Sequence, residues 1–238
     1  MEVQFAVAKI TKWATSESGD TLEMIERPHG GISMVLVDGQ RSGRSAKAIS
    51  NIVARKAVQL LSEGVRDGAA ARAAHDYLYT NRGGKVTATL NMLSVDTHTR
   101  TLVISRNNEA PVLVHTASGG FYLLDEPSKA VGVHRHTKPV ITEIPIEVGT
   151  ILVAFTDGLR HAGSLSGKGR HYDPYSGFQK MVTDGIREAR AICDRLLDDA
   201  MAMDDGRPRD DISVIAISVL ESNDGDEVRR LSGRLTLK

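Results

Sequence analysis

The stretch SMVLVDGQRSGRSAKAIS, residues 33–50, passes from a buried strand to a helix through an aspartate. Its four consecutive apolar residues, 34–37, predict a buried strand. Asp38 and Gly39 follow at once, and a polar turn then precedes the helical pattern. An aspartate in that position has a short, rigid stem, so its carboxylate is held near the edge of the core. The stretch therefore marks Asp38 as a candidate functional residue.

Aspartates flank three further strand candidates in the same way. ILVAFT ends in Asp157, Asp210 and Asp211 come directly before ISVIAISVL, and Asp20 precedes the possible strand TLEMIE. Carboxylates that converge from separate strands repel one another, so each must take up a proton or a cation must lie between them. A carboxylate cluster without histidine or cysteine favours hard divalent ions such as Mg²⁺ or Mn²⁺, which prefer oxygen ligands.

Each of these motifs, taken alone, is more typical of a turn or a helix cap than of a metal ligand, because Asp-Gly is a very common turn signal. Gly39 allows a tight turn in which a backbone carbonyl can also approach an ion. The metal-site hypothesis therefore depends on the combination of the four motifs and not on any single one.

The order of the elements predicts an α+β protein with antiparallel sheet, because regular strand–helix alternation is missing. Period-two patterns and buried apolar runs predict strands at 2–10, 31–39, 86–96, 100–107, 110–116, 120–125, 138–148, 149–158 and 210–220. Helices are expected from Ser42 or Ser45 to about Glu63, over 66–80, and over 179–204 with an interruption near 183–185. Residues 159–178, rich in Gly, Ser and His, are expected to form an irregular loop.

The composition limits the classes of partner and compartment. The chain has 238 residues with 30 Lys and Arg and 30 Asp and Glu, so no net charge attracts it to nucleic acid or anionic lipid. The longest apolar run is far below the roughly 18 residues of a spanning helix, and the N-terminus shows no signal-peptide pattern. The single cysteine, Cys193, favours a reducing cytoplasm and is expected to be a small buried residue. Trp13, the only tryptophan, offers no stacking platform for nucleic acid.

The motifs together resemble the metal-dependent protein phosphatase 2C (PP2C) superfamily, in particular the bacterial branch typified by stage II sporulation protein E. Those that carry the resemblance are SGD at 18–20, VDGQRSG at 37–43, FTDG at 155–158 and RDDISVIAI at 209–217, with weaker matches in NNEAP at 107–111 and AVG at 130–132. The resemblance implies a four-layer αββα sandwich of two antiparallel sheets flanked by helices. It covers residues 1–220, so we expect a catalytic domain over 1–221 and a polar, basic tail over 222–238.

The resemblance also implies the metal ligands. Asp38 would bridge two metal ions, Mn²⁺ or Mg²⁺. Asp157 and Asp210 would complete one site, and Asp20 and the carbonyl of Gly39 would complete the other. Asp211 is adjacent to Asp210, but Asp210 takes the place of the family's first acid before the final strand.

The implied activity is hydrolysis of phosphoserine or phosphothreonine on a protein by a water that two metals activate. Compact members of this branch, the stand-alone stressosome phosphatases of the RsbX kind, act on STAS-domain stress-signalling proteins, stressosome scaffolds and anti-sigma-factor antagonists. We expect the same substrate class here. Two alternatives stay open, a pseudophosphatase that only binds a phosphoprotein and another two-metal hydrolase acting on a small phosphoester or nucleic acid.

The chain departs from the family pattern at several positions. Gln40 stands where many relatives outside this branch have a histidine that acts as general acid, so the proton donor for the leaving group is unassigned. The phosphate-binding arginine that many relatives carry near the N-terminus has no clear match, and Glu109 replaces a glycine in the NNEAP turn. In the loop 161–178, a solvated segment is favoured over phosphate contact by Lys168, Arg170 and His171. His134 and His136 are likewise expected to be solvated and not to bind a metal.

Overall fold

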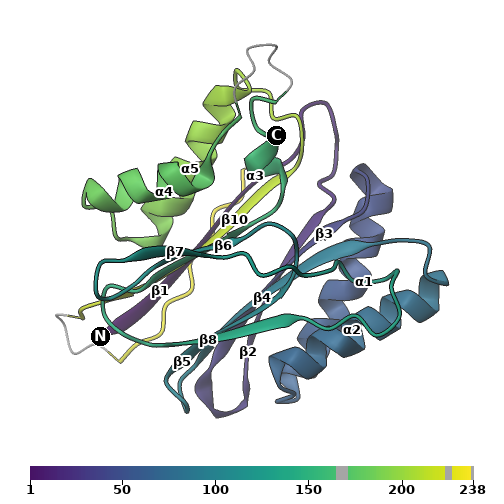
Figure 1. Cartoon of the computed structure of the whole chain (residues 1–238), viewed down its shortest axis with the longest axis horizontal. Helices are drawn as coiled ribbons and strands as arrows, with labels where there is room; N and C mark the ends of the chain where they lie inside the picture. Colours follow the sequence, from purple (N-terminus) through teal and green to yellow (C-terminus); the bar gives the residue numbers. More distant parts are fainter. Residues whose placement is uncertain (165–170, 223–226, 237–238) are drawn as a thin grey trace.

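The computed structural model describes residues 1–164, 171–222 and 227–236. Its strands form two antiparallel five-stranded sheets that pack face to face, and helices cover both outer faces (Figure 1). The first sheet has the order β1-β10-β9-β6-β7, with bounds Glu2–Ile10, Ile212–Leu220, Ile151–Phe155, Val112–His115 and Phe121–Leu124. The second has the order β2-β3-β4-β5-β8, with bounds Asp20–Glu26, Ile32–Gly39, Ala88–Asp96, Thr101–Asn107 and Val140–Pro145.

The longer helices form the two outer layers. Helices α1 and α2 pack on the second sheet, and their bounds are Gly43–Ser62 and Asp67–Arg82. Helices α4 and α5 pack on the first sheet, and their bounds are Pro174–Thr183 and Ala189–Met203. The short helix α3, Gly158–His161, follows β9, and the 3₁₀ turn η1, Pro28–Gly30, joins β2 to β3. The four-layer αββα sandwich implied by the resemblance is therefore confirmed.

The four consecutive apolar residues of β3 reflect burial of both faces of this strand. Met34 and Leu36 point into the core between the two sheets, whereas Val35 and Val37 point into the core beneath α1 and α2. Side chains alternate between the faces of a strand, so a strand covered on both sides is apolar along most of its length. The run ends at Asp38, the last residue but one of β3.

Most expected elements are present, including the strand of TLEMIE, which begins at Asp20 as β2. The interruption near 183–185 is confirmed, because α4 and α5 are separate helices and Gly185 has a φ of 91°. The expectation of an irregular loop over 159–178 is wrong at both ends. Helix α3 lies directly after Asp157, and α4 starts at Pro174, where the carboxylate of Asp173 caps the helix by accepting a hydrogen bond from the Tyr175 N–H.

The described part of the tail, residues 227–236, contains no helix or strand. Arg229 fastens it to the far sheet, because its Nη2 donates a 2.7 Å hydrogen bond to the carbonyl of Gly30 and its Nη1 lies 3.8 Å from Glu26. The boundary at residue 221 stays a prediction. Among the described residues, no helix has the length and apolar character needed to cross a membrane.

Candidate metal centre

Four aspartates predicted from the sequence meet at one end of the sandwich. Asp20, the first residue of β2, pairs directly with Asp38 of β3 in the antiparallel register. Asp157 follows β9 and Asp210 precedes β10, and these two strands are neighbours in the other sheet. The two sheets therefore contribute two carboxylates each.

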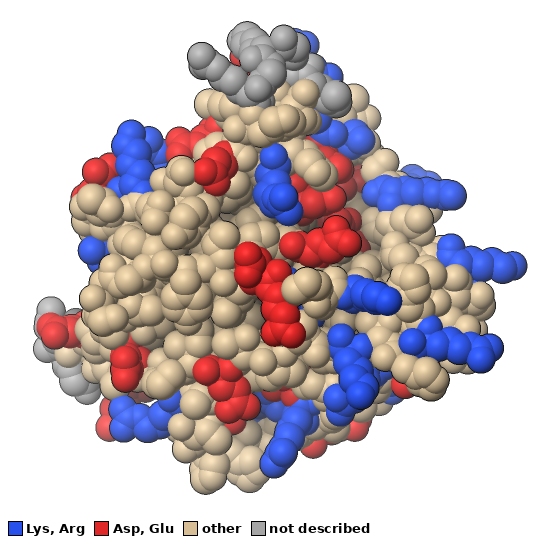
Figure 2. All heavy atoms as spheres, in the orientation of Figure 1, with Lys and Arg blue, Asp and Glu red and all other residues tan. Residues whose placement is uncertain are grey.

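These carboxylates line a single cavity of about 320 Å³. The residues around it are Asp20, Asp38, Gly39, Gln40, Arg41, Thr87, Ala88, Thr89, Asp157, Asp210 and Asp211. Acidic side chains gather on the face drawn in Figure 2, over the region where α3 and β3 lie in Figure 1. Every predicted site residue thus reaches the same cavity.

Asp20 is the most enclosed of these carboxylates. Its Oδ2 accepts hydrogen bonds from Ser213 Oγ at 2.6 Å and from Thr156 Oγ1 at 3.0 Å, both in the other sheet or at its end. Its Oδ1 is buried and has no hydrogen-bond partner among the described residues. Burial raises the pKa of Asp20 to about 6, although the hydrogen bond from Ser213 opposes that rise.

Repulsion is strongest at Asp38. Burial raises the pKa of Asp38 to about 9, and the charges of Asp20, Asp157 and Asp210 raise it further in that order. A buried acceptor without a donor and a set of mutually repelling carboxylates both require a cation or protons. An all-oxygen donor set fits a hard divalent ion, so the residues present fit the predicted metal site.

Two lysines form hydrogen bonds with the backbone of Asp20. Lys9 of β1 and Lys47 of α1 both donate to the backbone carbonyl of Asp20, at 2.6 and 2.8 Å. Burial lowers the pKa of Lys9, and the positive charge of Lys47 acts in the same direction. The sequence analysis missed both lysines, together with Thr156 and Ser213, because each lies in an ordinary strand or helix pattern with no motif of its own.

The structure separates the roles of Asp210 and Asp211. Asp211 is buried, and its two carboxylate oxygens accept hydrogen bonds from the backbone N–H groups of Lys12 at 2.9 Å and Gly19 at 2.7 Å. Asp211 therefore holds the loop that leads to Asp20. Asp210 is half-buried beside Asp157, and burial raises its pKa. Its Oδ1 accepts a hydrogen bond from the Asp211 N–H at 2.9 Å, so Asp210 keeps its second oxygen for an ion, whereas both oxygens of Asp211 are occupied.

His161 is an additional candidate that the sequence analysis did not find. Ligand atoms of Asp157, His161 and Asp210 all lie within 4.8 Å of one another, and His161 Nδ1 is 3.7 Å from Asp157 Oδ2. The histidine reaches this position because α3 places it one turn after Asp157. The helix was not expected there, which is why the pair was overlooked.

Close packing requires two glycines, Gly39 in the cavity lining and Gly158 directly after Asp157. A Cβ on Gly39 would lie 2.1 Å from the carbonyl oxygen of Ala46 in α1, and one on Gly158 would lie 2.1 Å from the carbonyl oxygen of Asp211. Gly39 is the last residue of β3, whereas the sequence analysis expected a tight turn there. Its missing side chain lets α1 approach the strand end.

The SpoIIE family model (stage II sporulation protein E) matches residues 28–220. The chain belongs to the SpoIIE family. A search of curated proteins with this sequence finds no match. Solved structures of PP2C-type phosphatases share the fold, as expected for the SpoIIE branch of the PP2C superfamily.

Three of these structures illustrate the likeness. The PP2C phosphatase domain of SpoIIE from Bacillus subtilis, solved with a fragment of its regulatory domain, is 16% identical with a TM-score of 0.77, and the match covers 93% of this chain but only 64% of that one. RsbX in complex with magnesium is 16% identical with a TM-score of 0.68, covering 91% and 95%. The catalytic domain of the serine/threonine phosphatase PstP with two manganese ions is 14% identical with a TM-score of 0.67, covering 92% and 99%.

In this SpoIIE-family chain, Gln40 is hydrogen-bonded to Thr87, the residue before β4. The Gln40 N–H donates to the Thr87 carbonyl at 3.0 Å, and its Oε1 accepts from the Thr87 N–H at 3.2 Å. The side chain thus fastens the rim of the cavity, and an amide supplies no acidic proton.

The remaining candidates lie apart from the cavity or outside the described residues. Lys168 and Arg170 fall in the segment that is not described, whereas His171 is exposed. His134 and His136 form no metal-binding group among the described residues. Cys193 is buried in α5, where burial raises the pKa of its thiol to about 12. The thiol therefore stays protonated, as in a residue that only packs in the core.

Proposed function

We propose that this SpoIIE-family chain is a Mn²⁺- or Mg²⁺-dependent serine/threonine protein phosphatase. The observation that carries the proposal is the convergence of Asp20, Asp38, Asp157 and Asp210 from two sheets on one cavity. The unpartnered buried Oδ1 of Asp20 adds to it. The magnesium and manganese in the structures of RsbX and PstP support the choice of ions.

The residues would be divided between two ions. Asp38 would contact both, Asp157 and Asp210 would complete one coordination shell, and Asp20 with the Gly39 carbonyl would complete the other. Bound divalent cations would supply a water of lowered pKa as nucleophile and positive charge for the phosphoryl oxygens. His161 lies close enough to Asp157 and Asp210 to join their shell or to orient Asp157.

The chain's own residues hold these ligands in place. Ser213 and Thr156 donate to Asp20 Oδ2, and the other oxygen, Oδ1, would remain available to an ion. Their donation also keeps the pKa of Asp20 from rising further and so favours the ionised form. Lys9 and Lys47 fix the backbone of Asp20 and place positive charge behind it.

The proposed substrate is phosphoserine or phosphothreonine on a STAS-domain stress-signalling protein. Support comes from the solved structures with this fold, which include RsbX and a protein with RsbU and RsbW domains from Mycobacterium tuberculosis. A stressosome study also supplied one of the similar structures. A cytoplasmic location, expected from the single cysteine, belongs to the same proposal.

The decisive experiment is hydrolysis of para-nitrophenyl phosphate and of a phosphorylated STAS protein, with and without Mn²⁺. We expect Mn²⁺-dependent turnover that Asp157→Asn and Asp210→Asn reduce by at least about a hundredfold, because each removes a charged ligand. Asp198→Asn, on the exposed face of α5, is the matched control and should leave the rate unchanged.

The outcomes separate the two leading functions. Full turnover by both Asp157→Asn and Asp210→Asn would contradict the metal-centre assignment. Binding of the phosphorylated STAS protein without turnover in any divalent ion would identify a pseudophosphatase. Circular dichroism spectra of the variants should match that of the wild type, so that loss of fold is not mistaken for loss of chemistry.

A further inference from the structure

The cavity contains one cationic side chain among its described lining residues, and this residue is Arg41. The five charged neighbours in that lining are all aspartates. In spite of them, none of the ion pairs or hydrogen bonds of the described chain involves the guanidinium of Arg41, and its side chain is exposed. Arg41 therefore lies at the edge of an acidic cavity with its five side-chain N–H donors unused among the described residues.

The backbone of Arg41 is also unusual. Its φ is 79°, in the left-handed region that favours glycine, and of the non-glycine residues with positive φ in the described chain it alone lines this cavity. Its conformation is imposed by its neighbours, because Gln40 is fixed to Thr87 by two hydrogen bonds and α1 begins at Gly43. A glycine would satisfy this backbone better, so the arginine side chain has a use that offsets the strain.

The charges of the cavity indicate what that use is. Two divalent cations would neutralise Asp20, Asp38, Asp157 and Asp210, and Asp211 already accepts two backbone hydrogen bonds and lies near Lys9. A bound phosphate monoester dianion would still lack a compensating charge. Arginine matches phosphate in geometry, because its planar fork donates two parallel hydrogen bonds to two oxygens. Its charge also persists at every working pH.

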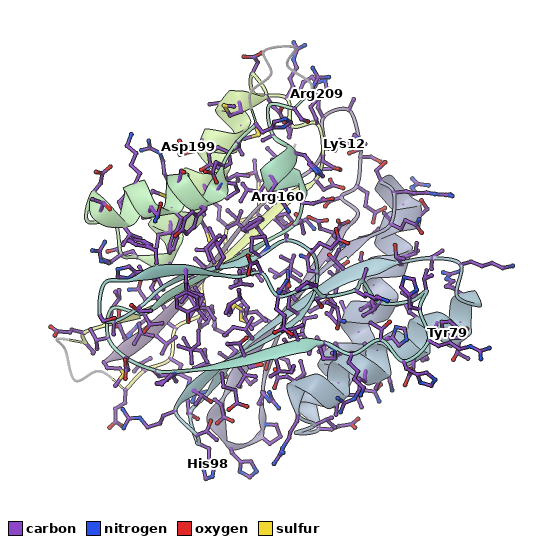
Figure 3. The ribbon with its side chains drawn as sticks, in the orientation of Figure 1. Lys12, Tyr79, His98, Arg160, Asp199 and Arg209 are labelled. Carbon is purple, nitrogen blue, oxygen red and sulfur yellow. The ribbon has the colours of Figure 1, made fainter. Side chains whose placement is uncertain are left out.

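Other cations near the cavity are placed differently. Lys12, Arg160 and Arg209 lie in the upper part of the view in Figure 3, around α3 and the ends of β1 and β10, but none of them lines the cavity. Arg44, in the first turn of α1, is exposed and also lies outside the lining. Among the described residues, Arg41 is thus the cationic residue that lines the cavity in which a phosphoryl group would be held.

We propose that Arg41 is the phosphoryl-binding residue of this cavity and contacts the non-transferring oxygens of the substrate phosphate and of product phosphate. The inference rests on the proposed function, since it assumes that a phosphate monoester occupies the cavity. It adds a named binding residue to a site for which the sequence analysis favoured none.

The test uses the full chain loaded with Mn²⁺ and the variants Arg41→Gly, Arg41→Ala, Arg41→Lys and Arg44→Ala. We expect Arg41→Gly to raise the KM for para-nitrophenyl phosphate and the inhibition constant for inorganic phosphate by about tenfold or more. The same variant should raise Tm by about 2 to 4 °C, because glycine relieves the left-handed backbone. A purely structural arginine would not give weaker phosphate binding together with higher stability.

The other variants separate charge, strain and nonspecific effects. Arg41→Ala should weaken phosphate binding as much as Arg41→Gly but without the rise in Tm. Arg41→Lys should give an intermediate KM, because lysine keeps the charge but loses the two-point contact. Arg44→Ala, one step into the helix, should resemble the wild type in every measurement.

Failure of this inference is distinguishable from failure of the proposed function. Wild-type hydrolysis with an Arg41→Gly variant whose KM and phosphate inhibition stay within twofold of wild type would overturn the inference alone. If Arg160→Ala weakened phosphate binding as much as Arg41→Gly or more, that result would also overturn the inference and would assign phosphate binding to α3. If wild type shows no turnover, calorimetric titration of the Mn²⁺-loaded protein with inorganic phosphate decides the matter. Weaker binding to Arg41→Gly would then support the inference, and unchanged binding would overturn it.

Discussion

Asp38 illustrates a conflict between stability and binding at a single residue. Its carboxylate is placed among three others, and burial together with their charges raises its pKa to about 9, far above the ordinary value of 3.8. Without metal, the folded protein therefore keeps a proton on Asp38 at pH values where the unfolded chain has released it. The arrangement is unfavourable for the apoprotein and favourable for a cation.

Asp38→Asn should make the metal-free protein less sensitive to alkaline pH. Because the native state binds the extra proton, the free energy of unfolding of the wild type falls as pH rises from about 4 and levels off above about 9. Between pH 6.5 and 9, above the pKa of Asp20, we expect the Tm of the EDTA-treated wild type to decline and that of Asp38→Asn to stay nearly constant. Scanning calorimetry across this range measures the difference.

Addition of Mn²⁺ to the same samples provides the complementary measurement. It should raise the Tm of the wild type at pH 8 and leave that of Asp38→Asn almost unchanged, because the amide cannot bridge two ions. Parallel pH profiles for the two proteins, or an equal response to Mn²⁺, would contradict the placement of Asp38 at the centre of the cluster.

The contact of β3 with α1 depends on a glycine at the strand end. A Cβ on residue 39 would lie only 2.1 Å from the Ala46 carbonyl oxygen. The helix and strand therefore approach more closely than a side chain at residue 39 would permit. This approach brings the start of α1, and with it the rim of the cavity, next to Asp38. The helix and the metal centre are therefore coupled by backbone packing.

Gly39→Ala should destabilise the metal-free protein by about 1 to 3 kcal/mol, because backbone must shift to accept the methyl group. Gly68→Ala is the control. Gly68 lies in α2, and a Cβ there would meet Ile141 Cδ1 at an ordinary 3.5 Å. It should be neutral or stabilising by up to about 1 kcal/mol, as expected for alanine in a helix. Urea unfolding compares the two, and a Gly39→Ala midpoint equal to that of the wild type would refute the packing argument.

At the level of the whole molecule, the candidate centre links the two sheets. Asp20 and Asp38 belong to one sheet, Asp157 and Asp210 flank strands of the other, and Ser213 and Thr156 donate across the gap to Asp20. An ion held by Asp38, Asp157 and Asp210 would have ligands from both sheets and would bind only the assembled sandwich. It would thereby stabilise the packing of the sheets against each other.

Removal of Mn²⁺ should therefore loosen both sheets together. At a free metal concentration of 100 times Kd, binding contributes about 2.7 kcal/mol to the free energy of unfolding, and EDTA should abolish this contribution. Hydrogen exchange should accelerate on metal removal at the ends of β3 and β9, whereas the edge strand β7 should be unaffected. A change limited to one sheet would contradict a centre shared by both.

Local patterns accounted for most of the architecture. The alternation of apolar residues located the strands, and runs such as 34–37 correctly indicated strands covered on both faces. Helix α3 was missed because four residues are too few to show a period, and the start of α4 was missed although Asp173 and Pro174 form a recognisable helix start. These are properties of neighbouring residues, which is why they can be recognised without a structure.

The candidate ligands were also recognisable in the sequence, because each aspartate lies at the end of an apolar run and the ordered set of motifs resembles a known family. Their meeting in one cavity could not be deduced from the runs themselves, since Asp20 and Asp210 approach only through the packing of two sheets. The same packing occupies both oxygens of Asp211 with backbone donors, whereas Asp210 accepts a backbone hydrogen bond at Oδ1 alone, although the two residues are adjacent in the chain. Short-range preferences thus specify the strands and their terminal carboxylates, whereas the long-range contacts between the sheets specify which of those carboxylates are available to an ion.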